Sequence, residues 1–176
     1  MSLRKWAIVA ALFCLPACKQ FYAQSQADAS VNFAKYRTFS FSNSNSDAPE
    51  GFTSGHLFNS IMQRRIQAEL YRDLTEKGFQ QAARSDASFI ISFSAGGRQE
   101  VQPLGAETGT TDAGNIRGAA SSVSRGALVI HFIDPKTNQA IWRGWVEAVM
   151  QPDDDLDAKV RAAVREVMKQ FPPSGA

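Results

Sequence analysis

The chain has 176 residues, 44% of them hydrophobic, which is enough for one domain with a substantial core. Its 19 Lys and Arg residues against 17 Asp and Glu residues give a formal net charge of +2. Two of the basic residues, Arg4 and Lys5, lie at the N-terminus, and the rest of the chain has 17 basic and 17 acidic residues. A neutral domain gives no reason to expect a nucleic-acid partner.

The N-terminus has the layout of a secretory signal. Two basic residues precede residues 6–15, an apolar stretch that is too short for a bilayer span of roughly twenty residues. Leu15-Pro16-Ala17-Cys18 follows and resembles the lipobox of bacterial lipoproteins. The resemblance implies cleavage between Ala17 and Cys18, and acyl chains on Cys18. We therefore expect a signal peptide at 1–17, with an uncut anchor helix or a plain secretory signal as alternatives.

A lipidated Cys18 predicts a location on the periplasmic side of the cell envelope, with the membrane contacted through the acyl chains. Lys19 follows the cysteine. In the enteric-type sorting pattern an Asp at this place retains a lipoprotein in the inner membrane, so Lys19 favours the outer membrane, with the inner membrane as the alternative. Both cysteines lie within the first 18 residues, so the rest of the chain has no thiol to mispair.

The segment 18–30 is polar and rich in Ala, Gln and Ser. We expect a tether there, with a mean reach of roughly 20 Å. A single folded domain should then cover 31–173. Its first strand is expected in the second half of 33–41, with Phe39 and Phe41 on one face, and a Ser- and Asn-rich loop should follow.

A helix is expected next, because apolar residues recur every fourth position. The stripe consists of Phe58, Met62, Ile66, Leu70 and Leu74, widened by Leu57 and Ile61. Gly78 suits the left-handed residue that ends a helix. Residues 87–94 then read as a second strand with Phe89, Ile91 and Phe93 on one face.

Residues 96–124 differ in composition, because Gly, Ala, Ser and Thr dominate and no apolar period survives. Such a stretch predicts a mobile loop, or alternatively a functional insertion. Residues 125–150 predict a β-hairpin that turns at Asp134 and Pro135. A last amphipathic helix begins at Leu156, behind three aspartates at 153–155 that should cap its N-terminus.

The expected element order is therefore β-α-β-β-β-α. Right-handed crossover connections place the first helix on one face of the sheet, and the second helix should pack beside it. The sequence thus predicts an α+β fold, a two-layer sandwich of a four-stranded mixed sheet with two helices on one face.

Several short motifs together resemble the lipoprotein family defined by DUF4136. They are Tyr36-Arg37-Thr38-Phe39, Lys77-Gly78-Phe79, Asp86-Ala87-Ser88-Phe89, Gly126-Ala127-Leu128, Ile141-Trp142-Arg143-Gly144 and Phe171-Pro172-Pro173, spread over most of residues 31 to 173. The resemblance implies a periplasmic lipoprotein and no particular activity. His131 stands where the family usually has an Asp, which puts any role of that position in doubt.

Residue types that commonly act in catalysis or bind metals are sparse in the sequence. His56 lies in a Gly- and Ser-rich loop without a second ligand at metal spacing, and His131 lies within a strand. Asp134 is expected to form the turn. No phosphate-binding, dinucleotide-binding or EF-hand motif occurs in the sequence. We therefore expect no metal, no cofactor and no catalytic residue.

Trp142, Arg143 and Trp145 form a candidate binding patch. The two tryptophans have opposite strand parity, so one should face the core while the other meets Arg143 in a cation–π contact or binds a partner. The leading hypothesis is a non-catalytic binding or structural module for an envelope protein or lipid. The alternative is an envelope hydrolase with a site near the 96–124 loop, His131 and Asp134.

Overall fold

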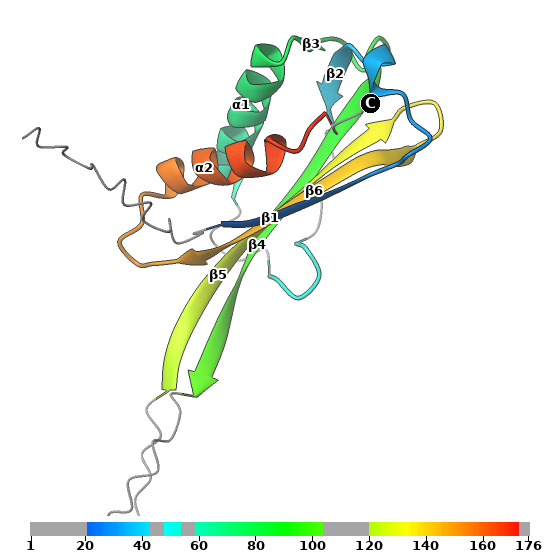
Figure 1. Ribbon diagram of the computed structural model, residues 1–176. Coiled ribbons are helices and arrows are strands. Elements are labelled where there is room, and N and C mark those ends of the chain that lie inside the picture. The colour runs from blue at the N-terminus through cyan, green and yellow to red at the C-terminus, as the bar shows by residue number, and fades with distance from the viewer. Residues whose placement is uncertain (1–20, 43–47, 54–58, 104–119, 173–176) are drawn as a thin grey trace, which may run out of the picture.

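The computed structural model describes residues 21–42, 48–53, 59–103 and 120–172. The predicted signal peptide and Cys18 lie outside these ranges. Two helices and six strands follow one another along the chain (Figure 1). They are β1 (Phe21–Ala27), β2 (Thr38–Phe41), α1 (Ser60–Glu76), β3 (Gln80–Gln81), β4 (Phe89–Pro103), β5 (Ala120–Asp134), β6 (Gln139–Met150) and α2 (Leu156–Met168), with a short 3₁₀ turn at Phe33–Lys35.

The strands form one mixed sheet in the order β1-β6-β5-β4-β2-β3. β2 runs parallel to β3 and β4, and the other pairs are antiparallel. Both helices lie on one face of this sheet (Figure 1). The predicted α+β class, the mixed sheet and the crossover through α1 are therefore confirmed. The predicted strand number is wrong, because the sheet has six strands instead of four.

One additional strand is β1, which lies in the segment expected to be a tether. Phe21 to Ala27 pair with β6 from Ala148 to Trp142, so β1 covers the edge of β6 that would otherwise expose its backbone. Phe21, Ala23 and Ala27 pack against the core, while Tyr22 is 61% exposed. Inward-facing and exposed residues thus alternate along β1, as in other strands. The sequence did not reveal this alternation, because most of the residues are small or polar types that are also common in flexible linkers.

The expected loop at 96–124 is largely a β-ribbon. β4 and β5 pair in unbroken register from Ile90–Ile133 to Pro103–Ala120. Only residues 104–119 remain between the strands, and they lie outside the described residues. The absence of an apolar period in 96–124 suggested a loop. This part of the ribbon lies beyond both helices (Figure 1), so neither of its faces is buried and neither needs regularly spaced large apolar residues.

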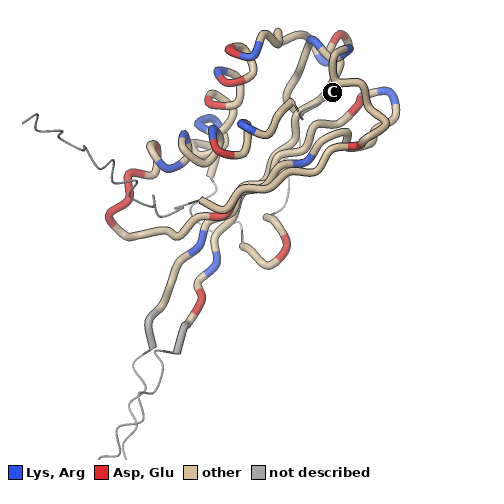
Figure 2. The backbone as a smooth tube through the Cα atoms, viewed as in Figure 1, with Lys and Arg blue, Asp and Glu red and all other residues tan. Residues whose placement is uncertain are grey.

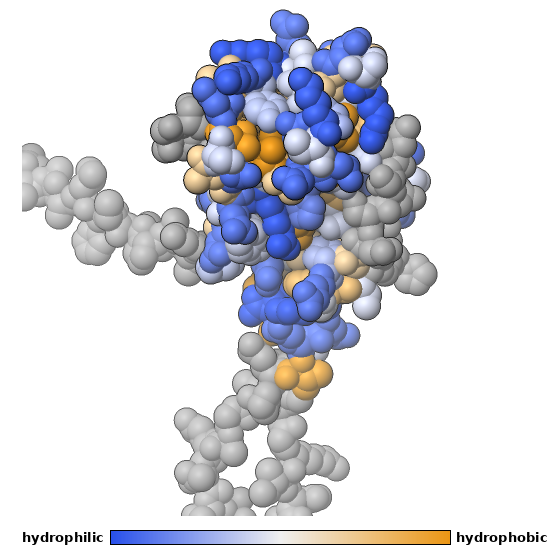
Figure 3. Space-filling model, turned by 90° about the vertical axis from the view of Figure 1, so that its right-hand side faces the viewer, coloured by the Kyte–Doolittle hydropathy of each residue, from blue (hydrophilic) through white to orange (hydrophobic). Residues whose placement is uncertain are grey.

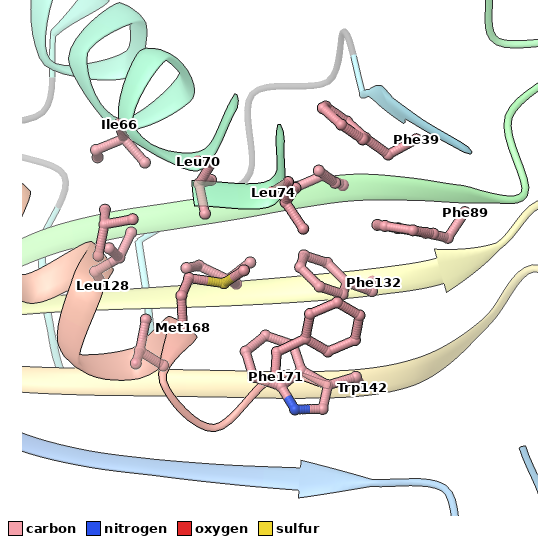
Figure 4. Packing of buried hydrophobic residues seen from close by; sticks show 14 of the residues in the cluster. Phe39, Ile66, Leu70, Leu74, Phe89, Leu128, Phe132, Trp142, Met168 and Phe171 are labelled. Atoms are coloured by element: carbon pink, nitrogen blue, oxygen red, sulfur yellow. The ribbon is translucent and has the colours of Figure 1, made fainter. Parts of the chain in front are cut away.

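The core lies between the helices and the sheet, and aromatic rings fill one end of it (Figure 4). The Phe132 ring lies 4.9 Å from Phe89, 4.8 Å from Trp142 and 4.5 Å from Phe171, measured between centroids. The helix stripe from Met62 to Leu74 is buried as predicted. Ile61 does not widen it, since this side chain is 50% exposed.

The predicted helix ends are confirmed where the structure describes them. Gly78 has a φ of 88° directly after α1, a conformation that costs glycine little. Asp155 is the N-cap of α2 and accepts hydrogen bonds from the backbone N–H groups of Asp157 and Ala158. The predicted stripe residues Leu57 and Phe58 lie outside the described residues.

Candidate functional site

His131 and Asp134 do not form a common site. His131 lies on the face of β5 that carries no helix, opposite Ser92 and Arg143 on the neighbouring strands. Its Nε2 is buried without a hydrogen-bond partner in the described part of the chain. Burial, with the positive charge of Arg143, lowers the pKa of His131 below its usual value. His131 is half-buried on this sheet face, and the residue paired with it on β4 is the hydroxyl residue Ser92.

Asp134 is a turn former, as predicted. Its Oδ1 accepts the Lys136 N–H at 2.7 Å, and its Oδ2 accepts the Tyr36 hydroxyl at 2.9 Å. Partial burial acts to raise the pKa of Asp134, but these hydrogen bonds outweigh burial and hold the pKa below its usual range. Because the carboxylate is engaged by its own turn and by Tyr36, it does not orient His131.

The tryptophan patch separates into a core residue and a surface pair, as predicted. Trp142 is 1% exposed and packs against Phe132 and Phe171. Trp145 lies on the opposite face, half-buried, and the Arg143 guanidinium lies 5.6 Å from its ring centroid. The surface pair Arg143 and Trp145 is therefore a cation–π contact that ties neighbouring positions of β6 together.

Metal ligands do not cluster in the described ranges. No group of three or more His, Cys, Asp or Glu side chains that could hold an ion occurs there. Asp155 caps α2, and Asp154 accepts the Gln151 N–H and pairs with Lys159, which lowers the pKa of Asp154. His56 lies outside the described residues. No described helix has the length and apolar character to cross a membrane.

The feature that stands out is the end of the β4–β5 ribbon, which we call the arm: residues 98–103 and 120–123. It projects past the body of the domain (Figure 1). β6 reaches only as far as Ser124, and on the other side a bridge from Thr53 to Gly97 is the last backbone contact along β4. The described arm therefore has two strands and no helix over it.

One face of the arm is charged, and its charges are paired with one another. Basic and acidic positions follow one another where the arm leaves the body (Figure 2). Glu100 lies 2.7 Å from Arg98 and 2.8 Å from the Arg125 Nε, and its pKa is lowered mainly by the hydrogen bond from Arg125. The Arg98 guanidinium also lies 3.7 Å from Glu147 and 4.6 Å from the Phe52 ring centroid.

The opposite face of the arm carries no charge among its described side chains. Gln99 lies beside Ser124, and Val101 lies beside Ser122, because paired residues of antiparallel strands share a face. All four side chains are exposed, and Val101 reaches 69%. Hydrophobic atoms at the far end of the described arm are visible in Figure 3. We call these four residues the uncharged face; Ser124 lies at the base of the arm, where β6 ends.

An apolar cavity of about 90 Å³ lies at the root of the uncharged face. Small residues of the sheet, including Ala95, Gly126 and Ala148, leave the space, and Met62 of α1 and Val160 of α2 wall it. Lys159 also lines the cavity, but its ammonium group pairs with Asp154. The cavity therefore suits an apolar group of about the size of one side chain.

The profile of DUF4136, a domain of unknown function, matches residues 23–173. The chain belongs to the DUF4136 family. Its resemblance to this family, noted above from short motifs, is thereby confirmed, and the matched range includes most of β1. A comparison with curated proteins found no match. Membership assigns no activity to the chain.

Solved structures share the fold of this DUF4136 domain. A DUF4136 protein of Bacteroides thetaiotaomicron is 15% identical, with a TM-score of 0.52 over 87% of this chain and 96% of that one. A PelC dodecamer of Paraburkholderia phytofirmans is 11% identical, with a TM-score of 0.51 over 84% and 94%. A PDZ domain protein of Parabacteroides distasonis is 16% identical, with a TM-score of 0.57 over 89% of this chain. This chain spans only 37% of that last protein.

Sequence reasoning missed the arm and the cavity. The signal for the arm was the strict alternation of Arg98, Gln99, Glu100 and Val101, in which every second residue is charged. The cavity left no signal of its own, because the residues around it come from six different elements.

Proposed function

We propose that this DUF4136 protein is a lipid-anchored protein of the bacterial envelope that acts as a non-catalytic binding module, with the arm as its binding element for a protein partner. The observation that carries this proposal is the exposed uncharged face, a flat β-surface outside the helical layer. Protein partners bind such surfaces without the desolvation cost of unpaired charges.

The shared fold supports an assembly role. PelC, whose fold covers 84% of this chain, is a dodecamer. A fold that is used once for self-association offers a surface layout that can serve association again. The hydrolase alternative loses support because the Asp134 carboxylate accepts hydrogen bonds from Tyr36 and from its own turn, whereas the His131 Nε2 has no hydrogen-bond partner in the described part of the chain.

The lipid anchor rests on the sequence. Cys18 follows an apolar stretch and a lipobox-like tetrapeptide, and it precedes β1 by only three positions. An acyl chain contributes about 0.8 kcal/mol per buried methylene, so several chains on one cysteine hold a domain firmly. An anchor at this place would hold β1, the adjacent cavity and the root of the arm near the membrane surface.

The anchor is tested with Cys18→Ala in cells fed a labelled fatty acid. We expect loss of the label and release of the domain from floating membranes. Cys14→Ala is the matched control, since this cysteine would leave with the signal peptide, and it should keep both properties. Unchanged label and flotation in Cys18→Ala would contradict the proposal.

A density gradient of separated membranes tests the sorting expectation from Lys19. The protein should band with the outer membrane, and Lys19→Asp should move it toward the inner membrane if the enteric-type pattern applies. Banding of the wild-type protein with the inner membrane would refute outer-membrane sorting while leaving the anchor intact.

A further inference from the structure

We propose that the apolar cavity between the helices and the sheet receives the end of one acyl chain of the lipid on Cys18. The inference rests on the proposed lipid anchor and goes beyond it, because it assigns an occupant to the cavity. Four observations carry it: the apolar lining, the volume, the place of the start of β1 in the cavity wall, and the short stretch of chain between β1 and Cys18.

The lining of the cavity selects an aliphatic ligand. Among the described residues that line it, Lys159 is the only charged one, and its ammonium group is paired with Asp154. The aliphatic stem of Lys159 is therefore what the cavity offers a ligand. Met62 and Met150 also line the space, and unbranched thioether side chains adapt readily to flexible apolar groups. An ionic or strongly polar ligand would lose its hydration here without gaining a partner.

The volume of about 90 Å³ suits a short stretch of hydrocarbon chain. A water-sized group takes roughly 30 Å³, so about three methylene-sized groups fit. Benzene occupies an apolar cavity of about 150 Å³ in an engineered protein, so the space in this domain is better suited to a slim linear chain than to a ring. The cavity is partly open to the surface, so the remainder of a longer acyl chain can stay outside it.

The start of β1 forms part of the cavity wall. Phe21 is the first residue of β1, and it lines the cavity together with Ala148, its partner on β6. Figure 1 shows the start of β1 beneath α2, whose residues Leu156 and Val160 line the same cavity. The described part of the chain therefore begins at the cavity itself.

Cys18 is held close to this wall by the length of the chain. Only Lys19 and Gln20 separate it from Phe21, and three residues reach at most about 11 Å. An acyl chain attached at this distance has an effective concentration on the order of millimolar at the cavity. A few methylene contacts then suffice to hold its end there for much of the time. A free lipid lacks this advantage, so the lipid on Cys18 is the occupant that the geometry favours.

Docking of one chain is compatible with anchoring by the others. Lipid tails are as apolar as the cavity wall, so a chain exchanges one apolar environment for another when it moves from the bilayer into the cavity. Several acyl chains on one cysteine hold a domain firmly, and the remaining chains keep the protein on the membrane. The docked end would fix the orientation of the domain, because the cavity wall would then lie directly against the lipid. The full, acylated chain in its membrane is the form in which to test this.

The test supplies intact cells with a fatty acid that carries a photoreactive diazirine at the far end of its chain. After irradiation, mass spectrometry of the full-length protein should find the acyl chain of Cys18 linked to cavity residues such as Met150 and Val160. Ala148→Leu fills the cavity and should reduce these cross-links about tenfold, because the added branch takes the space of the chain. Ala83→Leu adds the same branch at an exposed residue that does not line the cavity, and it should keep them. Cross-links that avoid the cavity, or that are equal in the two variants, would overturn the proposal.

A second measurement does not depend on filling the cavity. In a Cys14→Ala background, Val160→Cys places one free thiol in the cavity wall, and Tyr22→Cys places one beside Phe21 on the other face of β1. A maleimide should modify the thiol at position 160 about threefold more slowly in the acylated protein than in its Cys18→Ala counterpart, which corresponds to a docked fraction of about two thirds. The thiol at position 22 should react equally in both, which controls for shielding by the membrane. Equal rates at position 160, or equal slowing at both positions, would overturn the docking.

Incorporation of the photoreactive fatty acid reports the anchor separately from the docking. An acylated protein without cavity cross-links would refute the docking while leaving the anchor intact. A protein that takes up no fatty acid at Cys18 would refute both the anchor and the docking.

Discussion

The Tyr36 hydroxyl donates a hydrogen bond of 2.9 Å to Asp134 Oδ2, joining residues 98 positions apart. Tyr36 follows the 3₁₀ turn before β2, and Asp134 ends β5. The contact fixes the N-terminal segment to the turn of the β5–β6 hairpin. Burial, together with the Asp134 carboxylate, raises the pKa of Tyr36 to about 12.

Tyr36→Phe should lower the free energy of unfolding by about 1 kcal/mol, the usual net value of one hydrogen bond. Asp134→Ala should cost more, because it also removes the acceptor for the Lys136 N–H. Urea unfolding at neutral pH measures both changes. A Tyr36→Phe protein as stable as the wild type would show that the hydrogen bond contributes nothing.

The same pair predicts a pH dependence in the alkaline range. The unfolded tyrosine ionises near pH 10, whereas the folded one ionises near 12. The wild-type protein should therefore lose stability as the pH rises from 10 toward 12, because the unfolded state releases its proton first. Tyr36→Phe should lack this part of the loss.

His131 predicts a pH dependence in the acidic range. Burial holds its folded pKa below the unfolded value of 6.5, so the unfolded state takes up the proton first as the pH falls. Stability linked to His131 is fully present above pH 6.5 and is lost as the pH falls through the folded pKa. His131→Gln should show a shallower decline of unfolding free energy below pH 6.5, measured by urea titrations at several pH values. Parallel curves for both proteins would contradict this assignment.

The sequence predicted those elements in which burial forces a period. Helix α1 has a clear stripe from Met62 to Leu74 because its inner face packs into the core against the sheet. The hairpin turn at Asp134 and the helix cap at Asp155 could be predicted from the sequence, because local hydrogen bonds favour Asp at both positions. In each case the cause lies within a few residues of its effect.

Prediction from the sequence failed for elements whose structure depends on residues far away in the chain. β1 is a strand because β6 offers an edge more than a hundred residues away, and its own Ala, Gln and Ser carry little strand preference. The arm extends from the body with only one neighbouring strand to each strand, so no apolar period marks it. The candidate site could not be predicted for the same reason, because the cavity arises from the absence of large side chains in three neighbouring strands.

The glycine of the Ile141-Trp142-Arg143-Gly144 motif is required by close packing, and a substitution of Gly144 tests this requirement. A Cβ at Gly144 would lie 2.6 Å from Val167 Cγ2 and closer still to the Trp142 ring. Overpacking of this kind costs about 1–3 kcal/mol, so Gly144→Ala should lower the melting temperature clearly. Gly126→Ala is the control, since its Cβ would meet only the flexible end of Met150. Equal effects of the two changes would contradict the packing argument.

The two tryptophans of β6 should differ in their contribution to stability. Trp142→Ala removes a ring that is 1% exposed among Phe132 and Phe171, and such truncations cost about 3–5 kcal/mol. Trp145→Ala removes a half-buried ring that lies against the Arg143 guanidinium, so its loss should be smaller by at least about 1 kcal/mol. If the two substitutions lowered the free energy of unfolding equally in urea titrations, Trp145 would have to be as well packed as Trp142.

Replacement of residues 98–122 by a short Gly/Ser link should leave the domain folded. The described residues of the deleted segment lie beyond both helices (Figure 1), and none of them belongs to the core cluster. Its ion pairs are partly exposed, and such pairs contribute at most about 1 kcal/mol each. A shorter connection also costs little, because closure entropy changes only with the logarithm of loop length. We therefore expect a single cooperative melt close to that of the wild type, whereas Trp142→Ala should lower it sharply. A deletion that unfolds the domain would show that the arm is structural.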